Sequence, residues 1–319
     1  LTGNITPASG DIGIQFNTGA DRNTVTQTGN ITTTGDRAFG LLLFTSDSNT
    51  TTFTGNINTA GDAAYGVNLS SSDSNTTTMI GNITTTGLLS HGLFVFNSAS
   101  NTTNMTGNIK LTGGNAIYHF FNTTANTTNM TGDISLTGTG ISIQQSVSQI
   151  INMTGDINAR GAATGFGIAF STNADSNIVN MTGDITSESV GIWIKDGSDS
   201  NVITLAGDIT STGATAHGIL INLNSDSNII NMTGNITTKG ANAQGIQIDA
   251  SDNNNLTIDG NIITSGTGGN SEAILISNSD SNTFSLSGKV QSLGGDQAIS
   301  IDANSDSNTF NIQSGSTFL

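Results

Sequence analysis

The chain has 319 residues and a formal net charge of −16, with no Cys and only 9% charged residues, against about 25% in an average soluble protein. Its 7 Lys and Arg residues argue against nucleic-acid binding, which needs clustered cations to displace counterions, and against docking on an anionic membrane. No apolar run approaches the ~20 residues that cross a bilayer, and the lack of Cys excludes a disulfide framework and cysteine-based zinc sites.

A Gly-Asn/Asp-Ile tripeptide recurs along the whole chain at intervals of 23 to 28 residues, about 26 on average. Its copies begin at Gly3, Gly29, Gly55, Gly81, Gly107, Gly132, Gly155, Gly183, Gly207, Gly234 and Gly260, with a degenerate Gly-Lys-Val copy at Gly288. No linker or change of composition separates the copies. The repeat therefore predicts one domain over residues 1–319, without obvious caps, rather than the two globular domains that the length suggests.

Each repeat contains three short segments in which apolar and polar residues alternate. In chain order, the first follows the repeat Gly, as in residues 29–33, the second reads Gly-Ile-x-Ile, as in 191–194, and the third precedes the next repeat Gly, as in 230–233. Alternation with a period of two is typical of β-strands, and the Gly, Ser and Asp-Ser-Asn clusters between the segments are typical of turns. We therefore expect three strands per repeat, joined by connections too short for a helix.

Equivalent positions of successive repeats form apolar columns. The main column holds Ile5, Ile31, Ile57, Ile83, Ile109, Ile134, Ile157, Ile185, Ile209, Ile236, Ile262 and Val290. Strands that stack about 4.8 Å apart would join such columns into one continuous core. The sequence thus predicts an all-β, right-handed parallel β-helix (β-solenoid) of about twelve complete coils, or rungs, each with ~26 residues and three strands.

A column of Asn lies six residues before the repeat Gly. It comprises Asn23, Asn49, Asn75, Asn101, Asn126, Asn177, Asn201, Asn228, Asn254, Asn282 and Asn308, and Gln149 interrupts it. Stacked Asn side chains at a tight turn can pass amide hydrogen bonds from rung to rung, and Asn tolerates the left-handed backbone of a turn. We interpret this column as a structural Asn ladder.

A row of Asp lies two residues before the Asn column. Like charges stacked about 5 Å apart repel by roughly 1 kcal/mol per pair even in water, so an interaction that offsets this repulsion is expected. One interpretation is an Asx-type turn, in which each carboxylate accepts backbone N–H bonds. The alternative is weak Ca²⁺ binding, and no other cofactor is suggested. The candidate cation row is Asp175, Asp199, Asp226, Asp252, Asp280 and Asp306.

We do not expect an enzyme. Polysaccharide-cleaving sites need carboxylates that converge on one face with each other or with Arg or Lys. Here the basic residues are scattered, and His91, His119 and His217 lie in different repeats. Carbohydrate binding through Trp or Tyr has little support, because the chain has one Trp and two Tyr.

Rows of Thr suggest ice binding as a further alternative function. Pairs such as Thr52 and Thr54 would project outward from a strand, in the manner of an ice-binding plane. Such a plane should be flat, regular and uncharged, whereas charged residues break the Thr rows. We therefore interpret these rows as solvated strand faces with good β-propensity. The charged residues are Lys110, Arg160, Glu188 and Lys239, and Asn replaces Thr at Asn104, Asn129, Asn152 and Asn180.

Both ends of the chain read as ordinary repeats, although solenoids normally carry polar caps. One interpretation is that the chain is a piece of a longer solenoid. The other is that the two ends of different copies stack on each other, in a heterologous contact that propagates without closing. The predicted end-to-end interface comprises Leu1, Ile5, Ile14, Phe16, Ile299, Ile301, Phe310, Ile312, Phe318 and Leu319.

The Gly-Asn-Ile-Thr repeats, the Asn ladder, the lack of Cys and the acidic composition resemble the passenger regions of bacterial autotransporters and related β-helical adhesins. The resemblance covers essentially the whole chain and concerns architecture rather than a diagnostic motif. It implies an extracellular or cell-surface protein. We expect a structural protein whose partner is itself, in a head-to-tail homopolymer that forms a surface filament or matrix fibre. The alternative is an adhesin rod that binds glycans or proteins on host or neighbouring cells.

Overall fold

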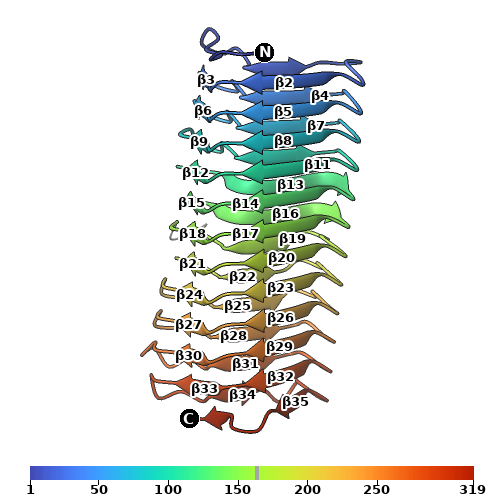
Figure 1. The fold of residues 1–319 in the computed structure, drawn as a ribbon. Coiled ribbons are helices and arrows are strands. Elements are labelled where there is room, and N and C mark those ends of the chain that lie inside the picture. Colours follow the sequence, from blue (N-terminus) through green and yellow to red (C-terminus); the bar gives the residue numbers. More distant parts are fainter. Residues whose placement is uncertain (162–164) are drawn as a thin grey trace. The chain divides into compact units, whose positions relative to one another are not determined.

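The computed structural model describes residues 1–161 and 165–319, which contain 36 β-strands and no helix. They form two compact units, Leu1–Gly155 and Asp156–Leu319. Within each unit the chain passes through three strands per rung, and each strand pairs with the equivalent strand of the next rung (Figure 1). This confirms the predicted parallel β-solenoid, whereas the single domain over residues 1–319 stays a prediction. The described residues include no helix of the length and hydropathy needed to span a membrane.

Unit 1 contains three parallel sheets, which we name A, B and C. Sheet A consists of β2 (Thr24–Thr28), β5 (Thr50–Thr54), β8 (Thr76–Ile80), β11 (Thr102–Thr106), β14 (Thr127–Thr131) and β17 (Ile150–Thr154). Sheet B consists of β3 (Ile31–Thr34), β6 (Ile57–Ala60), β9 (Ile83–Thr85), β12 (Ile109–Leu111) and β15 (Ile134–Leu136). Sheet C consists of β1 (Ile14–Phe16), β4 (Leu41–Phe44), β7 (Val67–Ser70), β10 (Leu93–Phe96), β13 (Asn115–Thr124) and β16 (Thr139–Val147).

Unit 2 contains the corresponding sheets A′, B′ and C′. Sheet A′ consists of β20 (Ile178–Thr182), β23 (Val202–Ala206), β26 (Ile229–Thr233), β29 (Asn255–Asp259), β32 (Thr283–Ser287) and β35 (Thr309–Ile312). Sheet B′ consists of β18 (Ile157–Ala159), β21 (Ile185–Ser187), β24 (Ile209–Ser211), β27 (Ile236–Thr238), β30 (Ile262–Thr264), β33 (Lys289–Ser292) and β36 (Thr317–Phe318). Sheet C′ consists of β19 (Ile168–Ser171), β22 (Ile192–Ile194), β25 (Ile219–Asn222), β28 (Ile246–Asp249), β31 (Ile274–Ser277) and β34 (Ile299–Ile301).

The core of each unit consists of inward-pointing aliphatic columns. In sheet B, Ile31, Ile57 and Ile83 are neighbours in register, 26 residues apart, and each is at most 1% exposed. Burial of an aliphatic side chain of this size contributes roughly 1.5–3 kcal/mol. Because successive side chains point to opposite faces of a strand, the residue between two core positions faces outward. The period-two pattern of the sequence therefore separates a core from an outer face in every strand.

The repeat Gly is required by the way in which rungs approach each other. Gly81 has a φ of 144°, a conformation that L side chains rarely adopt, and a Cβ at this position would lie 1.8 Å from the carbonyl oxygen of Gly55. The same clash with the preceding repeat Gly recurs at Gly107 and Gly132, at 2.1 and 2.2 Å. Only Gly allows the backbones of neighbouring rungs to come this close. This contact explains why the Gly-Asn/Asp-Ile tripeptide recurs.

Candidate functional site

The Asn column forms a hydrogen-bonded ladder inside the wall of the solenoid. The backbone N–H of Asn75 donates to Oδ1 of Asn101 at 2.8 Å, and its side-chain Nδ2 donates to Oδ1 of Asn101 at 3.1 Å and to the carbonyl oxygen of Ser46 at 3.0 Å. Asn75 is only 1% exposed. The same bonds join Asn201 to Asn228 in unit 2, at 2.9 and 3.1 Å. These buried amides are occupied by the protein itself, so the ladder holds rungs together and offers no recognition surface.

The exception in this ladder, Gln149, contacts a histidine inside the core. His119 is fully buried, with Nδ1 2.8 Å from Oε1 of Gln149 and Nε2 3.2 Å from Oγ1 of Thr128. Burial lowers the pKa of His119 to about 4, and the hydrogen bond with Gln149 opposes this only in part. The imidazole is therefore neutral at pH 7. The sequence shows the interruption of the Asn column, but it does not show that a buried His lies against it.

The other two histidines are also held by the fold. Nδ1 of His91 accepts the backbone N–H of Asn115 at 2.9 Å, and Nδ1 of His217 accepts that of Gln244 at 3.1 Å. Burial lowers the pKa of both imidazoles to about 4. Each imidazole is therefore neutral at pH 7 and accepts a hydrogen bond from the backbone of the following rung.

The Asp row is stabilised by backbone hydrogen bonds between rungs. In unit 2, Oδ1 of Asp199 accepts the backbone N–H of Asp226 at 2.7 Å, and Oδ1 of Asp226 accepts that of Asp252 at 2.7 Å. Partial burial raises the pKa of Asp226, the hydrogen bond from Asp252 opposes this rise, and the charges of Asp199 and Asp252 add to it. The expected interaction that offsets repulsion is thus a bond to the next rung. The described residues contain no group of three or more His, Cys, Asp or Glu side chains arranged to hold a metal ion, and Ca²⁺ binding stays a prediction.

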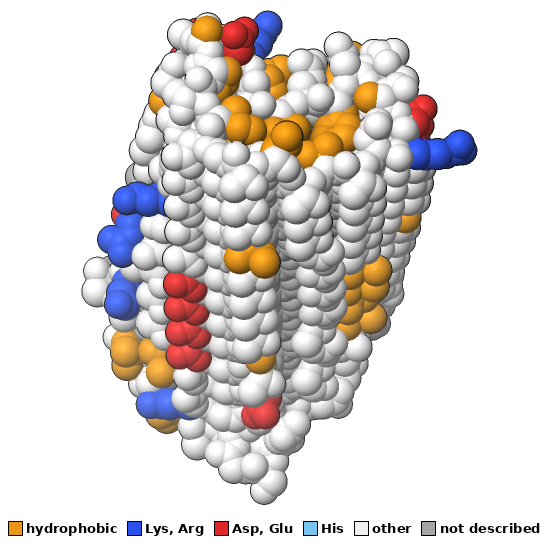
Figure 2. Space-filling view, turned by 45° about the horizontal axis from the view of Figure 1, so that its top comes forward, with side chains coloured by type: hydrophobic (Ala, Val, Ile, Leu, Met, Phe, Trp, Pro, Cys, Tyr) orange, Lys and Arg blue, Asp and Glu red, His pale blue; other side chains and the backbone are white. Residues whose placement is uncertain are grey.

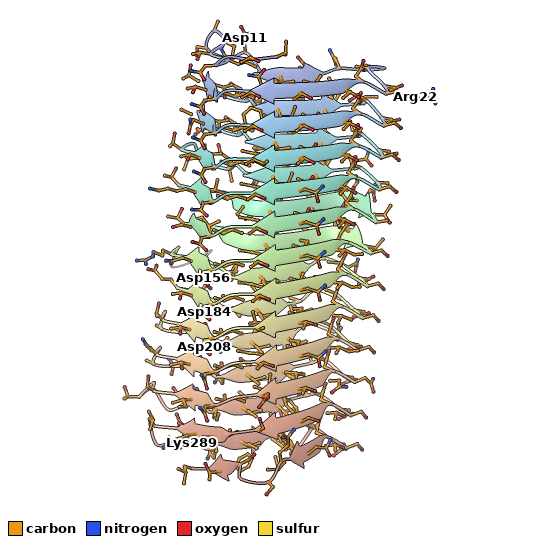
Figure 3. The ribbon with its side chains drawn as sticks, viewed as in Figure 1. Asp11, Arg22, Asp156, Asp184, Asp208 and Lys289 are labelled. Atoms are coloured by element: carbon orange, nitrogen blue, oxygen red, sulfur yellow. The ribbon has the colours of Figure 1, made fainter. Side chains whose placement is uncertain are left out.

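A second acidic row lies at the repeat tripeptide, where Figure 3 labels Asp156, Asp184 and Asp208. The backbone N–H of Asp184 donates to Oδ1 of Asp156, and that of Asp208 donates to Oδ1 of Asp184, both at 2.8 Å. Asn235 takes the next place and donates its backbone N–H to Oδ1 of Asp208 at 2.7 Å. Because Asn accepts the same bond in other rungs, as Asn56 does from the backbone N–H of Asn82, the ladder requires a side-chain oxygen acceptor and does not require its charge.

The terminal rungs expose apolar side chains that inner rungs bury. At the start of unit 1, Leu1 is 78% exposed, and Figure 2 shows apolar side chains open to view inside the polar wall at this end. At the end of unit 2, Ile312 is 43% and Phe318 is 37% exposed, whereas their register partners Leu286 and Val290 are each 1% exposed. Of the predicted interface residues, the first rung holds Leu1, Ile5, Ile14 and Phe16, and the last holds Ile299, Ile301, Phe310, Ile312, Phe318 and Leu319. Phe16 is only 5% exposed, and Phe310 stacks on Phe284 at 4.8 Å between ring centroids.

An aromatic cluster on the outside of sheet C was missed by the sequence analysis. Phe94 and Phe96 point outward from β10, and their ring centroids lie 5.4 Å from Tyr118 and 5.8 Å from Phe120, respectively, on the neighbouring strand β13. We name this cluster the aromatic face. It comprises Phe39, Tyr65, His91, Phe94, Phe96, Tyr118, Phe120 and Phe121. The small number of Trp and Tyr residues did not indicate this cluster, because Phe supplies five of its eight rings.

Rings of the aromatic face largely cover each other. Phe39 stacks on Tyr65 at 5.1 Å with 24° between the planes, and His91 stacks on Phe94 at 5.2 Å with 21°. Burial raises the pKa of Tyr118 to about 12, and its hydroxyl donates to Oε1 of Gln144 at 2.7 Å. Such contacts contribute about 0.5–1.5 kcal/mol each beyond area burial. The face is thus half-buried, rigid and apolar.

Unit 2 carries a smaller aromatic contact on the outside of sheet C′. The ring of Trp193 lies 4.8 Å from that of Phe166, and its indole N–H donates to Oδ1 of Asn222 at 3.0 Å. Nζ of Lys195 lies 4.1 Å from the Trp193 ring centroid and 3.4 Å from a carboxylate oxygen of Asp196. This is a local cation–π contact, and the ammonium group of Lys195 is already paired with the Trp193 ring and the Asp196 carboxylate.

Comparison of the chain with known protein families, curated proteins and solved structures finds no match. Function must therefore be inferred from the ladders, the terminal rungs and the faces themselves.

Proposed function

We propose that the chain is an extracellular structural subunit that stacks head-to-tail into a surface filament or matrix fibre. The observation that carries this proposal is the directionality of the two polar ladders. Each ladder ends in an acceptor at one terminal rung and in a donor at the other. A second copy would therefore continue the bonds that already join the rungs within each unit.

The Asn ladder donates towards the C-terminal end. Each backbone N–H bonds to Oδ1 of the Asn in the following rung, as Asn282 does with Asn308 at 2.8 Å. In the described part of the chain, the backbone N–H of Asn308 has no acceptor and Oδ1 of Asn23 has no donor. Asn308 of one copy can thus donate to Asn23 of the next.

The Asp row runs in the opposite direction. Where Asp residues occupy successive rungs, the backbone N–H of one bonds to Oδ1 of the Asp in the preceding rung, as Asp306 does with Asp280 and Asp47 does with Asp21. Among the described residues, Oδ1 of Asp306 has no donor and the backbone N–H of Asp21 has no acceptor. Head-to-tail stacking therefore satisfies a second pair of groups, with the donor now on the first rung.

Apolar burial and strand pairing favour the same contact. Strand β1 at one end, and β34, β35 and β36 at the other, stand last in their sheets. Unpaired strand edges are templates for pairing with another chain. The exposed Leu1, Ile312 and Phe318 would gain the burial that equivalent positions have in inner rungs. Because the two contacting surfaces differ, the association can propagate without closing.

The test is assembly of the purified chain. We expect fibres in negative-stain microscopy and sedimentation that increases with concentration. Ile312→Asp should suppress fibres, because it places a charge in the contact, whereas the control Ile229→Asp should not, because Ile229 is 37% exposed on the outer face of β26. A wild-type chain that stays monodisperse and monomeric at high concentration would refute the proposal.

A second candidate is an adhesin rod, and the aromatic face is the observation that favours it. Phe121 is 39% exposed and Phe44, on the same sheet, is 44% exposed, so a partner could bury apolar area there. An adhesin would appear in micrographs as single short particles that bind cells. Loss of cell binding on replacing Phe121 and Phe44 by Ser, with no change in assembly, would select this function over the fibre.

A further inference from the structure

The outer face of sheet A in unit 1 is a regular array of Thr. Six strands contribute three outward positions each, and the eighteen positions hold 13 Thr, 3 Asn and 2 Ile. We name this array the Thr face. Its columns in register are Thr24, Thr50, Thr76, Thr102, Thr127 and Ile150; Thr26, Thr52, Thr78, Asn104, Asn129 and Asn152; and Thr28, Thr54, Ile80, Thr106, Thr131 and Thr154.

The Thr face carries no charge, although Asn104, Asn129 and Asn152 replace Thr in its central column, as the sequence predicts. The charged residues expected to break the Thr rows lie elsewhere: Lys110 lies in β12 of sheet B, Arg160 follows β18, Glu188 follows β21, and Lys239 follows β27. Figure 2 shows the face formed by β2, β5, β8 and β11 towards the viewer, white apart from an apolar patch and without red or blue side chains. The Thr face is thus an uncharged surface of a chain in which only 9% of the residues are charged.

The hydroxyl groups of this face are directed at solvent. Within the described residues, none of its Thr hydroxyls makes a hydrogen bond to the protein, in contrast to inward Thr33 and Thr59, which donate to carbonyl oxygens at 2.7 and 2.9 Å. Each outward hydroxyl offers one donor and two acceptors to water, beside a methyl group. The Asn residues of the central column instead bond to each other, with Nδ2 of Asn129 2.8 Å from Oδ1 of Asn104.

The array repeats in two directions on the scale of a water lattice. Neighbouring strands are about 4.8 Å apart, and alternate residues along a strand are about 6.6 Å apart. The branched Cβ restricts the rotamers of Thr, which fixes the positions of its hydroxyl and methyl groups. Six strands extend the array over about 24 Å. A charged group would orient water radially around itself, whereas alternating hydroxyl and methyl groups can hold first-shell water in a fixed two-dimensional pattern.

We propose that the Thr face binds ice, by ordering its hydration water into a pattern that joins the lattice of a growing crystal. The ligand is crystalline water, and the binding groups are the Thr hydroxyls and methyls of the six strands. The side chains of the face point outward from sheet A, whereas head-to-tail assembly uses the strand edges and inward side chains of the end rungs, so this activity neither requires nor prevents that assembly. An ordinary solvated strand face would have the same composition without affecting ice.

The test compares thermal hysteresis and ice-recrystallisation inhibition in three proteins. The wild-type chain should produce both effects. The double variant Thr52→Lys and Thr78→Lys, in the central column, should reduce thermal hysteresis at least fivefold. The control Thr84→Lys places the same charge on the outer face of β9 in sheet B and should retain wild-type activity. Circular dichroism and melting temperature would show that the variants fold.

If the double variant folds poorly, the single variant Thr54→Lys, at an exposed position of the third column, should give the same loss. Partition of labelled protein into a slowly growing ice surface provides an independent readout. The proposal is wrong if the wild-type chain shows no thermal hysteresis and no partition into ice. It is also wrong if Thr84→Lys reduces the activity as much as the central-column variant does.

Discussion

Protonation of His119 should make the stability of unit 1 dependent on pH. Unfolded His titrates near 6.5, and burial lowers the folded pKa to about 4. Below pH 6.5 the unfolded chain therefore binds a proton that the folded chain does not. The contribution of the buried, neutral His119 to the stability of the fold is fully present above pH 6.5 and is lost as the pH falls towards 4. At 1.36 kcal/mol per pH unit, the loss reaches about 2 kcal/mol at pH 5.

The variant His119→Leu isolates this contribution. His119 pairs in register with Val95 and Ile143, so an aliphatic side chain fits the column. Oε1 of Gln149 keeps a donor in the variant, because Nδ2 of Asn126 lies 3.0 Å from it. The variant has no imidazole at this position, so its stability does not fall in acid on account of this residue. The stability difference, wild type minus variant, should therefore fall by about 2 kcal/mol between pH 7 and pH 5.

The assay is urea unfolding of both proteins at pH 7, 6 and 5, followed by far-ultraviolet circular dichroism. A titration of the imidazole signals by NMR would give the folded pKa directly. The reasoning is refuted if the stability difference does not change with pH. It is also refuted if the His119 resonance titrates near 6.5 in the folded chain.

Three further changes test the rung contacts. Gly81→Ala should lower the free energy of unfolding by about 4 kcal/mol or more, because its Cβ would meet the carbonyl oxygen of Gly55 at 1.8 Å. The melting temperature should fall accordingly, and a near-wild-type value would contradict this close approach. Asp226→Asn should raise stability by roughly 1 kcal/mol at pH 7, because Asn keeps the acceptor and removes the repulsion. The raised pKa of Asp226 means that wild type becomes more stable as the pH falls through it, so the advantage of Asn should shrink in acid, and an unchanged advantage would argue against charge repulsion. Asn228→Ala should cost about 2 kcal/mol in urea unfolding, because it leaves the buried N–H of Asn201 without its 2.9 Å acceptor, and a neutral effect would argue against the ladder.

Local patterns in the sequence were sufficient to predict the strands and the core. The Ile column from Ile31 onward follows from alternation and the repeat period, because inward side chains of a stacked strand must be apolar. The Asn ladder follows from spacing alone. These features depend on equivalent positions in neighbouring rungs, and a fixed period makes those positions visible in the sequence.

The outer faces could not be predicted in the same way. Thr78 lies in β8 of sheet A and Lys110 lies in β12 of sheet B. The repeat period alone does not show that these two residues belong to different faces. The aromatic face likewise depends on contacts such as Tyr65 with Phe94, whose ring centroids are 4.9 Å apart across two rungs. The contact between Gln149 and His119 joins the turn before β17 to a strand of sheet C. Each case needs the positions of side chains from different strands, which the repeat period does not give.

The close fit of Gly81 against Gly55 has a consequence for how such a chain can change length. Within each unit, successive rungs share the repeat-glycine contact, the polar ladders and the aliphatic columns. A duplicated or deleted segment of one whole repeat would leave all these contacts between the remaining rungs intact. A segment of any other length inside a strand would turn core side chains outward or displace a glycine from its contact. Whole repeats are therefore the units in which the gene can lengthen or shorten this protein while its fold is retained.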